Sequence, residues 1–152
     1  MAGLKQARLL AVATPAALLG GAYIAQYGFG LYPCEMCWWQ RYPHFAALAL
    51  GLVSFFAVPP RVWTALAGLA IITSGLIGGF HAGVEYGWWQ GITGCAKVTG
   101  GLDVLDPAAA PLIRCDQAPW SLAGISLAGW NFLFSCAGGI AILVLSLKKE
   151  EA

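Results

Sequence analysis

Two cysteines and an arginine lie close together near the start of the chain, in the segment Pro33-Cys34-Glu35-Met36-Cys37-Trp38-Trp39-Gln40-Arg41. Cysteines separated by two residues form a tight disulfide that opens easily, and nearby positive charge stabilises the thiolate that carries out exchange. If a helix begins near Cys37, Arg41 lies one turn further along the same face, and Cys37 lies at the positive end of that helix. The pattern therefore predicts a redox-active dithiol.

Two other uses of a Cys-x-x-Cys pair are less well supported by the surrounding residues. A structural zinc site needs two further ligands at suitable spacing, but the other cysteine pair is widely separated, and His44 and His81 are expected near helix ends. Covalent haem attachment requires a histidine directly after the second cysteine, where this chain has Trp38. We therefore predict no metal site.

The remaining cysteines leave two interpretations open. Cys95 and Cys115 lie in a second polar segment, where they could form a structural disulfide that staples a loop on the oxidising side of a membrane. Beside the first cysteine pair they could instead form the second step of a relay, because thiolate–disulfide exchange passes oxidising power by contact. Cys136 lies in an apolar segment and is interpreted as a small packing residue.

The composition of the chain indicates a membrane protein with one domain. Of its 152 residues, 59% are hydrophobic and only 10% are charged, whereas a soluble domain carries about 25% charged residues. Much of the surface must therefore face something other than water. The net charge of +1 gives no support to nucleic-acid binding, which needs clustered lysine and arginine.

Four windows of the chain contain no Asp, Glu, Lys or Arg, and each can hold the roughly 17–25 apolar residues that a transmembrane helix needs. Helices are expected because lipid cannot satisfy free backbone amides. The predicted fold is all-α, an integral membrane four-helix bundle with two outward-facing cysteine-bearing loops. The helices are expected at about 9–29, 43–58, 62–82 and 122–147, and the outer loops at about 30–42 and 83–119.

Basic residues suggest how the bundle is oriented. Five of them (Lys5, Arg8, Arg61, Lys148 and Lys149) lie on one side of the predicted spans and three (Arg41, Lys97 and Arg114) on the other. Cytoplasmic loops carry the excess of lysine and arginine, so both termini are predicted to be cytoplasmic. A cleaved signal peptide and a set of buried soluble helices are the alternatives for the apolar windows. The first window is long for a signal peptide and lacks an obvious small-x-small cleavage site, which favours a retained helix.

Taken together, these residues resemble the DsbB family of bacterial inner-membrane proteins, which reoxidise the periplasmic dithiol oxidase DsbA. The resemblance extends over nearly the whole chain. It rests on the four predicted spans, the Cys34–Cys37 pair followed by Arg41, the segment His81-Ala82-Gly83-Val84-Glu85, and Cys95 and Cys115 followed by Pro119-Trp120.

The resemblance implies a role for each of the matching residues. Cys95 would form a mixed disulfide with a DsbA-like, thioredoxin-fold periplasmic partner, and Cys115 would pass the oxidation state to Cys34. Cys37 would be the thiolate that faces a bound quinone, either ubiquinone or menaquinone. Arg41 would help to position the quinone, and His81 would lie near its ring.

Two rival functions are weighed beside this one. A quinone-linked enzyme of the vitamin K epoxide reductase type also uses a membrane Cys-x-x-Cys, but the order of motifs here fits DsbB better. A small transporter or assembly factor with two structural disulfides is the rival from a non-enzymatic class. The predicted spans carry none of the charged residues that a charged-substrate or proton pathway often uses.

Overall fold

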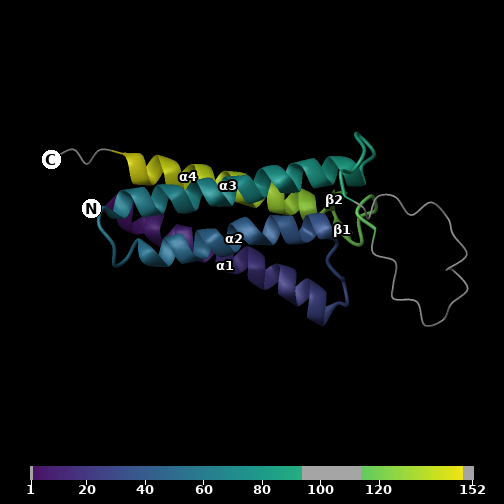
Figure 1. Cartoon of the computed structure of the whole chain (residues 1–152), viewed down its shortest axis with the longest axis horizontal. Coiled ribbons are helices and arrows are strands. Elements are labelled where there is room, and N and C mark those ends of the chain that lie inside the picture. The colour runs from purple at the N-terminus through teal and green to yellow at the C-terminus, as the bar shows by residue number, and fades with distance from the viewer. Residues whose placement is uncertain (1, 94–113, 149–152) are drawn as a thin grey trace, which may run out of the picture.

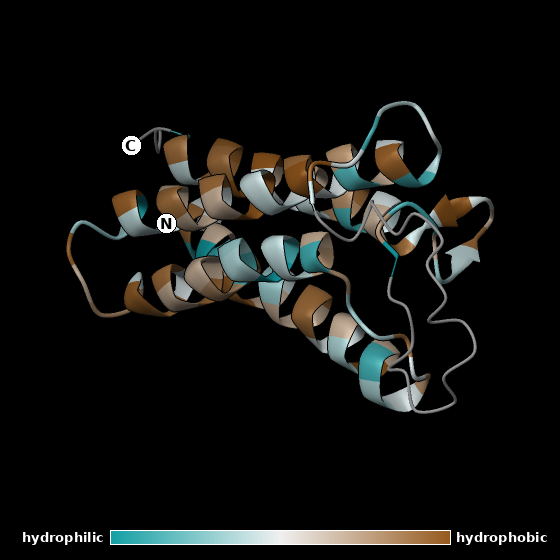
Figure 2. Cartoon of the chain, turned by 45° about the vertical axis from the view of Figure 1, so that its right-hand side comes forward, coloured by the Kyte–Doolittle hydropathy of each residue, from teal (hydrophilic) through white to brown (hydrophobic). Residues whose placement is uncertain are grey.

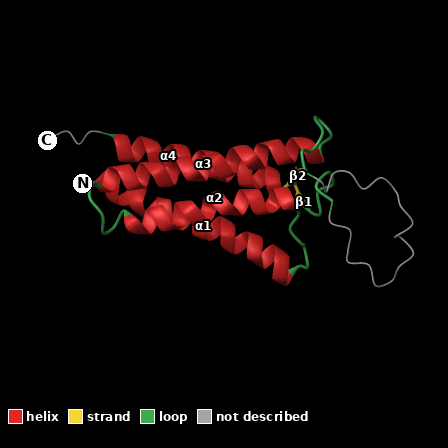
Figure 3. Cartoon of the chain, in the orientation of Figure 1, coloured by secondary structure: helices red, strands yellow, loops and turns green. Residues whose placement is uncertain are grey.

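The computed structural model describes residues 2–93 and 114–148. In this part of the chain the elements follow the order α1 (Ala2–Gly28), α2 (Glu35–Val53), α3 (Pro60–Glu85), β1 (Ser121–Leu122), β2 (Ile125–Ser126) and α4 (Leu127–Leu147). The four helices run side by side along the long axis of the molecule, and β1 pairs with β2 as a short antiparallel hairpin (Figures 1 and 3).

The two ends of the bundle carry different segments. The two chain termini and the connection between α2 and α3 lie at one end, and the connection between α1 and α2 and the β hairpin lie at the other (Figure 1). Cys34 belongs to the second end, since it lies directly before α2. Cys95 falls outside the described residues, as do Lys97 and Lys149.

The starts of the helices follow from local sequence. Cys34 has an extended backbone, and its Sγ accepts a hydrogen bond from the Cys37 amide at 3.2 Å, so α2 begins at Glu35. Pro60 occupies the first turn of α3, where a missing N–H costs nothing. Ser126 caps α4 by accepting a hydrogen bond from the Gly129 amide.

The helix of the dithiol segment differs in its limits from the one expected at about 43–58. α2 spans Glu35–Val53, because the side chain of Cys34 supplies a cap that hydrophobicity alone does not reveal. Pro43 therefore lies inside the helix instead of at its start. At the other end, the amide of Ser54 bonds back to the Leu50 carbonyl and the helix stops there. The two cysteines and Arg41 consequently share one regular helical start.

Small residues allow α3 and α4 to approach closely. A Cβ atom placed on Gly139 would lie 2.8 Å from the Gly68 carbonyl oxygen, and one placed on Gly75 would lie 2.9 Å from the Cys136 sulfur. Real Cβ atoms do not come so near, so only glycine fits at these crossings. The central cluster beside them contains Ala47 and Ile142, both fully buried. Packing through small residues is the usual way in which helices associate in membranes.

The outer face of the bundle is apolar. Many large hydrophobic side chains are exposed, among them Ile24, Leu66, Phe134 and Val144, and Figure 2 shows hydrophobic residues along all four helices. Three helices are long and apolar enough to cross a membrane: Gly3–Gly28, Pro60–Glu85 and Leu127–Leu147. The chain is thus an all-α, multi-pass membrane bundle, as its sequence predicts, while a span on α2 stays a prediction.

Candidate active site

Cys34 and Cys37 meet at the N-terminus of α2. Their Sγ atoms lie 2.8 Å apart, with Cys34 buried and Cys37 half-buried. The hydrogen bond to Cys37 and then burial raise the pKa of the Cys34 thiol. When one proton is shared by the two sulfurs it therefore stays on Cys34, and the negative charge falls on Cys37. The positive end of the α2 dipole also favours a thiolate there.

Arg41 lies one turn beyond Cys37, as its spacing predicts, and its guanidinium joins α2 to α1. It donates to Gln26 Oε1 at 2.6 Å and to the Ala22 carbonyl at 3.3 Å. Its planar group also lies over the rings of Tyr23 and Trp38, 4.9 Å and 4.8 Å from their centroids. These contacts hold a positive charge in a fixed position near the dithiol.

His81 comes from α3 and reaches the dithiol from the other side. Its Nδ1 accepts a hydrogen bond from Gln40 Nε2 at 2.9 Å. Gln40 Nε2 also donates to the Met36 carbonyl, which identifies it as the amide nitrogen. The His81 proton must therefore be on Nε2 when the ring is neutral. That atom lies 3.2 Å from the Cys115 carbonyl oxygen and 3.6 Å from Cys34 Sγ.

Cys115 packs beside the first cysteine pair. It is fully buried in one cluster with Cys34, Met36 and Val84, and the Thr93 hydroxyl donates to its sulfur at 3.4 Å. Contact between Cys115 and Cys34 is what a relay between the two outer loops requires. Cys34 and Cys115 are far apart along the chain, so the sequence predicts their proximity only through the resemblance to the DsbB family. The position of Cys95 lies outside the described part.

The ligand atoms of Cys34, Cys37 and His81 lie within 4.8 Å of one another, the kind of cluster that could hold a metal ion. A structural zinc site takes four ligands, and the described residues offer three here. The nitrogen that would have to bind the ion is His81 Nε2, which carries the ring proton because Gln40 bonds to Nδ1. The donor set therefore fits thiol chemistry better than zinc.

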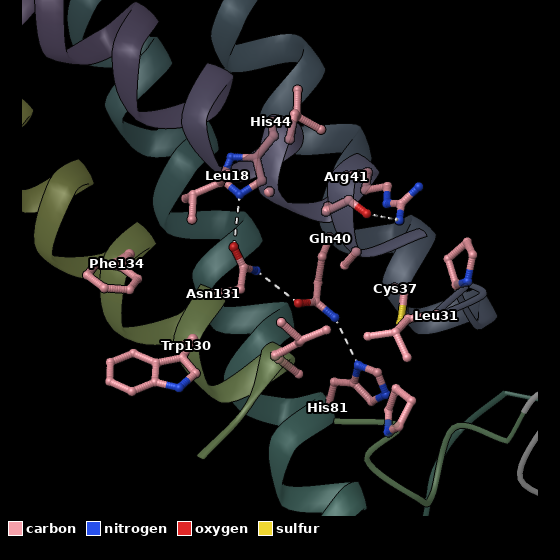
Figure 4. Close-up of a pocket in the computed structure, with 18 of the residues that line it drawn as sticks. Leu18, Leu31, Cys37, Gln40, Arg41, His44, His81, Trp130, Asn131 and Phe134 are labelled. Carbon is pink, nitrogen blue, oxygen red and sulfur yellow. Dashed lines mark hydrogen bonds between the residues drawn. The ribbon is translucent and has the colours of Figure 1, made fainter. Parts of the chain in front are cut away.

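Two cavities meet at this cluster. The inner cavity, of about 250 Å³, is bounded mainly by α1, α2 and α4, with apolar walls that include Leu18, Leu31 and Phe134 (Figure 4). The outer cavity, of about 280 Å³, is lined by loop residues, including Arg114 and Gln117. Four polar or reactive side chains line both cavities: Tyr32, Cys37, His81 and Glu85. The dithiol thus forms part of a wall between two spaces of different character.

Sequence reasoning missed several polar residues of the inner cavity. Gln40, His44 and Asn131 are joined by hydrogen bonds, although they were not predicted as site residues. Asn131 is the single asparagine of the chain and lies within an apolar segment. Polar residues inside membrane spans usually serve a function, so this position could have been identified from the sequence. The carboxylate of Glu85, whose side chain is 2% exposed, lies 3.8 Å from His81 Nε2.

Comparison with known proteins identifies the family of the chain. The family model for the disulfide bond formation protein DsbB matches residues 4–145. Disulfide bond formation protein B of Verminephrobacter eiseniae is 33% identical, over 91% of this chain and 82% of the relative. The protein of the same name from Polaromonas sp. is 30% identical, over 91% of this chain and 86% of the relative. The one from Marinobacter nauticus is 28% identical, over 78% of this chain and 77% of the relative. No solved structure is significantly similar to the chain. The match over nearly the full length shows that this chain belongs to the DsbB family of disulfide bond formation proteins.

Proposed function

We propose that this protein is a membrane thiol:quinone oxidoreductase that reoxidises a DsbA-like dithiol protein and so supports disulfide formation in exported proteins. Electrons pass from the partner to Cys95–Cys115, then to Cys34–Cys37, and finally to ubiquinone or menaquinone. The observation that carries the proposal is that Cys37 lines both cavities, one open to loop residues and one enclosed by apolar helices. Bacterial periplasms are known to be kept oxidising by DsbA, DsbB and quinone acting in series.

The thiol side of the reaction is supported by the contacts of Cys115. Its burial in one cluster with Cys34 supports attack of its thiolate on the Cys34–Cys37 disulfide. Exchange breaks one S–S bond for each one formed, so the partner dithiol is oxidised as the protein is reduced. Attack of the Cys115 thiolate on Cys34 forms a Cys34–Cys115 disulfide and releases Cys37 as the leaving thiolate, whose negative charge the N-terminus of α2 stabilises.

The inner cavity fits the head group of a quinone. A cavity of about 150 Å³ lined by apolar side chains binds benzene, so about 250 Å³ accommodates a ring with substituents. The apolar walls from α1 and α4 suit such a ring, and the remainder of an isoprenoid chain can lie in lipid. A bound quinone supplies the capacity to accept two electrons and two protons. Cys37 and Arg41 both line this cavity, which puts the reducing sulfur and a fixed cation beside the ring.

The roles of the chain's own residues follow from these positions. Cys37 provides the thiolate that gives up electrons, and its partner Cys34 closes the disulfide behind it. Arg41 stabilises the negative charge that develops in the cavity, and it costs no reorganisation because Gln26 and two aromatic rings already hold it. The apolar walls exclude water, which strengthens this interaction.

We further propose that the protein lies in the bacterial inner membrane with both termini in the cytoplasm and the cysteines on the periplasmic side. The end of the bundle that carries the termini holds four of the described basic residues: Lys5, Arg8, Arg61 and Lys148. Arg41 and Arg114 belong to the opposite end, with the dithiol. This bias agrees with the rule that cytoplasmic connections are richer in lysine and arginine.

The deciding experiment follows quinone absorbance and partner thiols together in the purified protein. With a reduced DsbA-like protein and ubiquinone-1 or a menaquinone analogue, we expect turnover that is lost in Cys34→Ser, Cys37→Ser, Cys95→Ser and Cys115→Ser. Cys136→Ser is the matched control, because this cysteine packs between α3 and α4 away from the dithiol, and it should keep full activity. Absence of turnover with either quinone in folded protein would instead favour structural disulfides. Turnover that survives without Cys95 and Cys115 would show that the partner meets the first pair directly.

A further inference from the structure

A chain of buried polar side chains crosses the bundle beside the inner cavity. It links His81 on α3, Gln40 on α2, Asn131 on α4 and His44 on α2 (Figure 4). The three successive hydrogen bonds measure 2.9 Å, 2.9 Å and 3.0 Å. The first histidine lies beside the dithiol, and the second is two helical turns deeper in the bundle. The mechanism proposed above makes no use of the second one.

Backbone carbonyls fix which atom is the donor in each hydrogen bond of this series of side chains. Gln40 Nε2 donates to the Met36 carbonyl, so Gln40 Oε1 is the atom that faces Asn131. Asn131 Nδ2 donates to the Ser74 carbonyl at 3.2 Å as well as to Gln40, so Asn131 Oδ1 faces the other way. The Ser135 hydroxyl donates to that same oxygen at 2.9 Å. Asn131 therefore presents only an acceptor to His44.

The protonation of His44 follows from its partner. Its Nε2 must donate to Asn131 Oδ1, so in the neutral ring its Nδ1 carries a lone pair and no proton. His44 is 3% exposed, and its Nδ1 is buried without a hydrogen-bond partner among the described residues. An unpaired polar atom in such a place costs about 1–3 kcal/mol. This atom is thus a fixed, unused acceptor in a side chain that lines the inner cavity.

The position of His44 relates it to the dithiol. It follows Cys37 by two helical turns on the same face of α2, about 10 Å along the axis. Figure 4 shows the ring beside Leu18, with one nitrogen on Asn131 and the other turned away from it. Cys37 and His44 therefore mark two positions along one cavity.

We propose that His44 Nδ1 accepts a hydrogen bond from a hydroxyl group of the reduced quinone, so that the site prefers quinol to quinone. This rests on the quinone site of the proposed function. A quinone carbonyl has no proton to offer an acceptor, whereas the quinol has a hydroxyl at the same position. Asn131 acts as a positioning residue, because it holds the proton of His44 on Nε2.

The preference for quinol over quinone affects the driving force of electron transfer from the dithiol. The reaction converts one dithiol and one quinone into one disulfide and one quinol, with two electrons and two protons transferred. A site that binds the product more tightly than the reactant makes the bound quinone a stronger oxidant. One neutral hydrogen bond corresponds to about a fivefold to tenfold difference in affinity, which is about 20–30 mV for a two-electron couple.

The test measures binding of ubiquinol-1 and ubiquinone-1 in the full-length Cys37→Ser background, where neither form of the ligand reacts. His44→Leu should weaken ubiquinol-1 binding about fivefold to tenfold and ubiquinone-1 binding less than about twofold. Phe134→Leu is the matched control, because it alters an apolar wall of the same cavity and should change both affinities by the same factor. Equal effects of His44→Leu on both ligands, no effect, or a larger effect on ubiquinone-1 would overturn the proposal.

A second measurement needs no substitution at His44. The chain has two histidines, so nitrogen NMR of 15N-histidine-labelled protein in the same background resolves their ring nitrogens. The Nδ1 signal of His44 should have the unprotonated shift without ligand and should move on addition of ubiquinol-1 but not of ubiquinone-1. A protonated Nδ1, or a signal insensitive to ubiquinol-1, would contradict the proposal. Failure of oxidised wild-type protein to bind either ligand would instead remove the quinone site itself.

Discussion

The Nε2 atom of His81, on α3, lies 3.6 Å from the sulfur of Cys34, which directly precedes α2. Cys34 also lies 2.8 Å from Cys37 and is itself buried. Of the two cavities, Cys34 lines only the outer one and is buried among apolar neighbours, whereas Cys37 lines both. This difference between two neighbouring thiols suggests separate tasks, with Cys34 exchanging with Cys115 and Cys37 facing the electron acceptor.

The first prediction concerns the pH at which each thiol reacts. Because the hydrogen bond to Cys37 and burial raise the pKa of Cys34, Cys34 stays protonated at neutral pH and ionises only when the pH is raised. In fully reduced protein at pH 7, iodoacetamide should modify Cys37 first and leave Cys34 largely intact. Cys37→Ala removes the largest cause, so the onset of Cys34 alkylation should move to lower pH. Mass spectrometry of digested protein measures both, and equal alkylation of Cys34 and Cys37 at pH 7 would contradict this assignment.

The second prediction concerns the guanidinium that joins α1 to α2. Arg41→Ala should raise the apparent KM for ubiquinone-1 about tenfold or more, because a fixed charge-assisted contact contributes about 1.5–3 kcal/mol. Gln26→Leu keeps the charge but removes its 2.6 Å partner, so it should raise KM by a smaller factor. Steady-state kinetics at saturating partner protein separates KM from kcat. Lys5→Ala, at the opposite end of the bundle, serves as the control, and an unchanged KM in Arg41→Ala would exclude the assigned role.

The third prediction concerns the crossing of α3 and α4. Gly139→Ala should lower stability by about 1–3 kcal/mol, because its Cβ would lie 2.8 Å from a backbone oxygen of Gly68 that cannot easily move. Gly20→Ala is the matched control within α1, where a Cβ meets nothing within 4 Å, and it should be neutral or slightly stabilising. Thermal unfolding in detergent, followed by circular dichroism, compares the two. A melting temperature equal to that of wild type for Gly139→Ala would show that the helices can separate without cost.

The sequence predicts the parts of the site that depend on short spacing. Two cysteines three positions apart and an arginine four positions later must lie on one face over the first two turns of any helix that begins there, and α2 has this arrangement. Long apolar windows likewise predict the all-α membrane bundle. The limits of α2 are not predictable from hydrophobicity, because the side chain of Cys34 decides where the helix starts.

Contacts between distant segments escape such reasoning. Asn131 meets Gln40 and His44 only because α2 and α4 both pack against α1 and α3, and no local pattern encodes that arrangement. The β1–β2 hairpin was not expected either. It turns at Ala123 and Gly124, both with positive φ, and lacks the Asn-Gly or Asp-Gly pair that usually marks such a turn.

Cys37, His81 and Glu85 line both the apolar cavity and the loop-side cavity. In the proposed function, the protein substrate therefore binds on the loop side of these residues and the lipid-soluble substrate binds on the helix side. The two substrates have separate sites, and the dithiol between them passes electron pairs from one to the other.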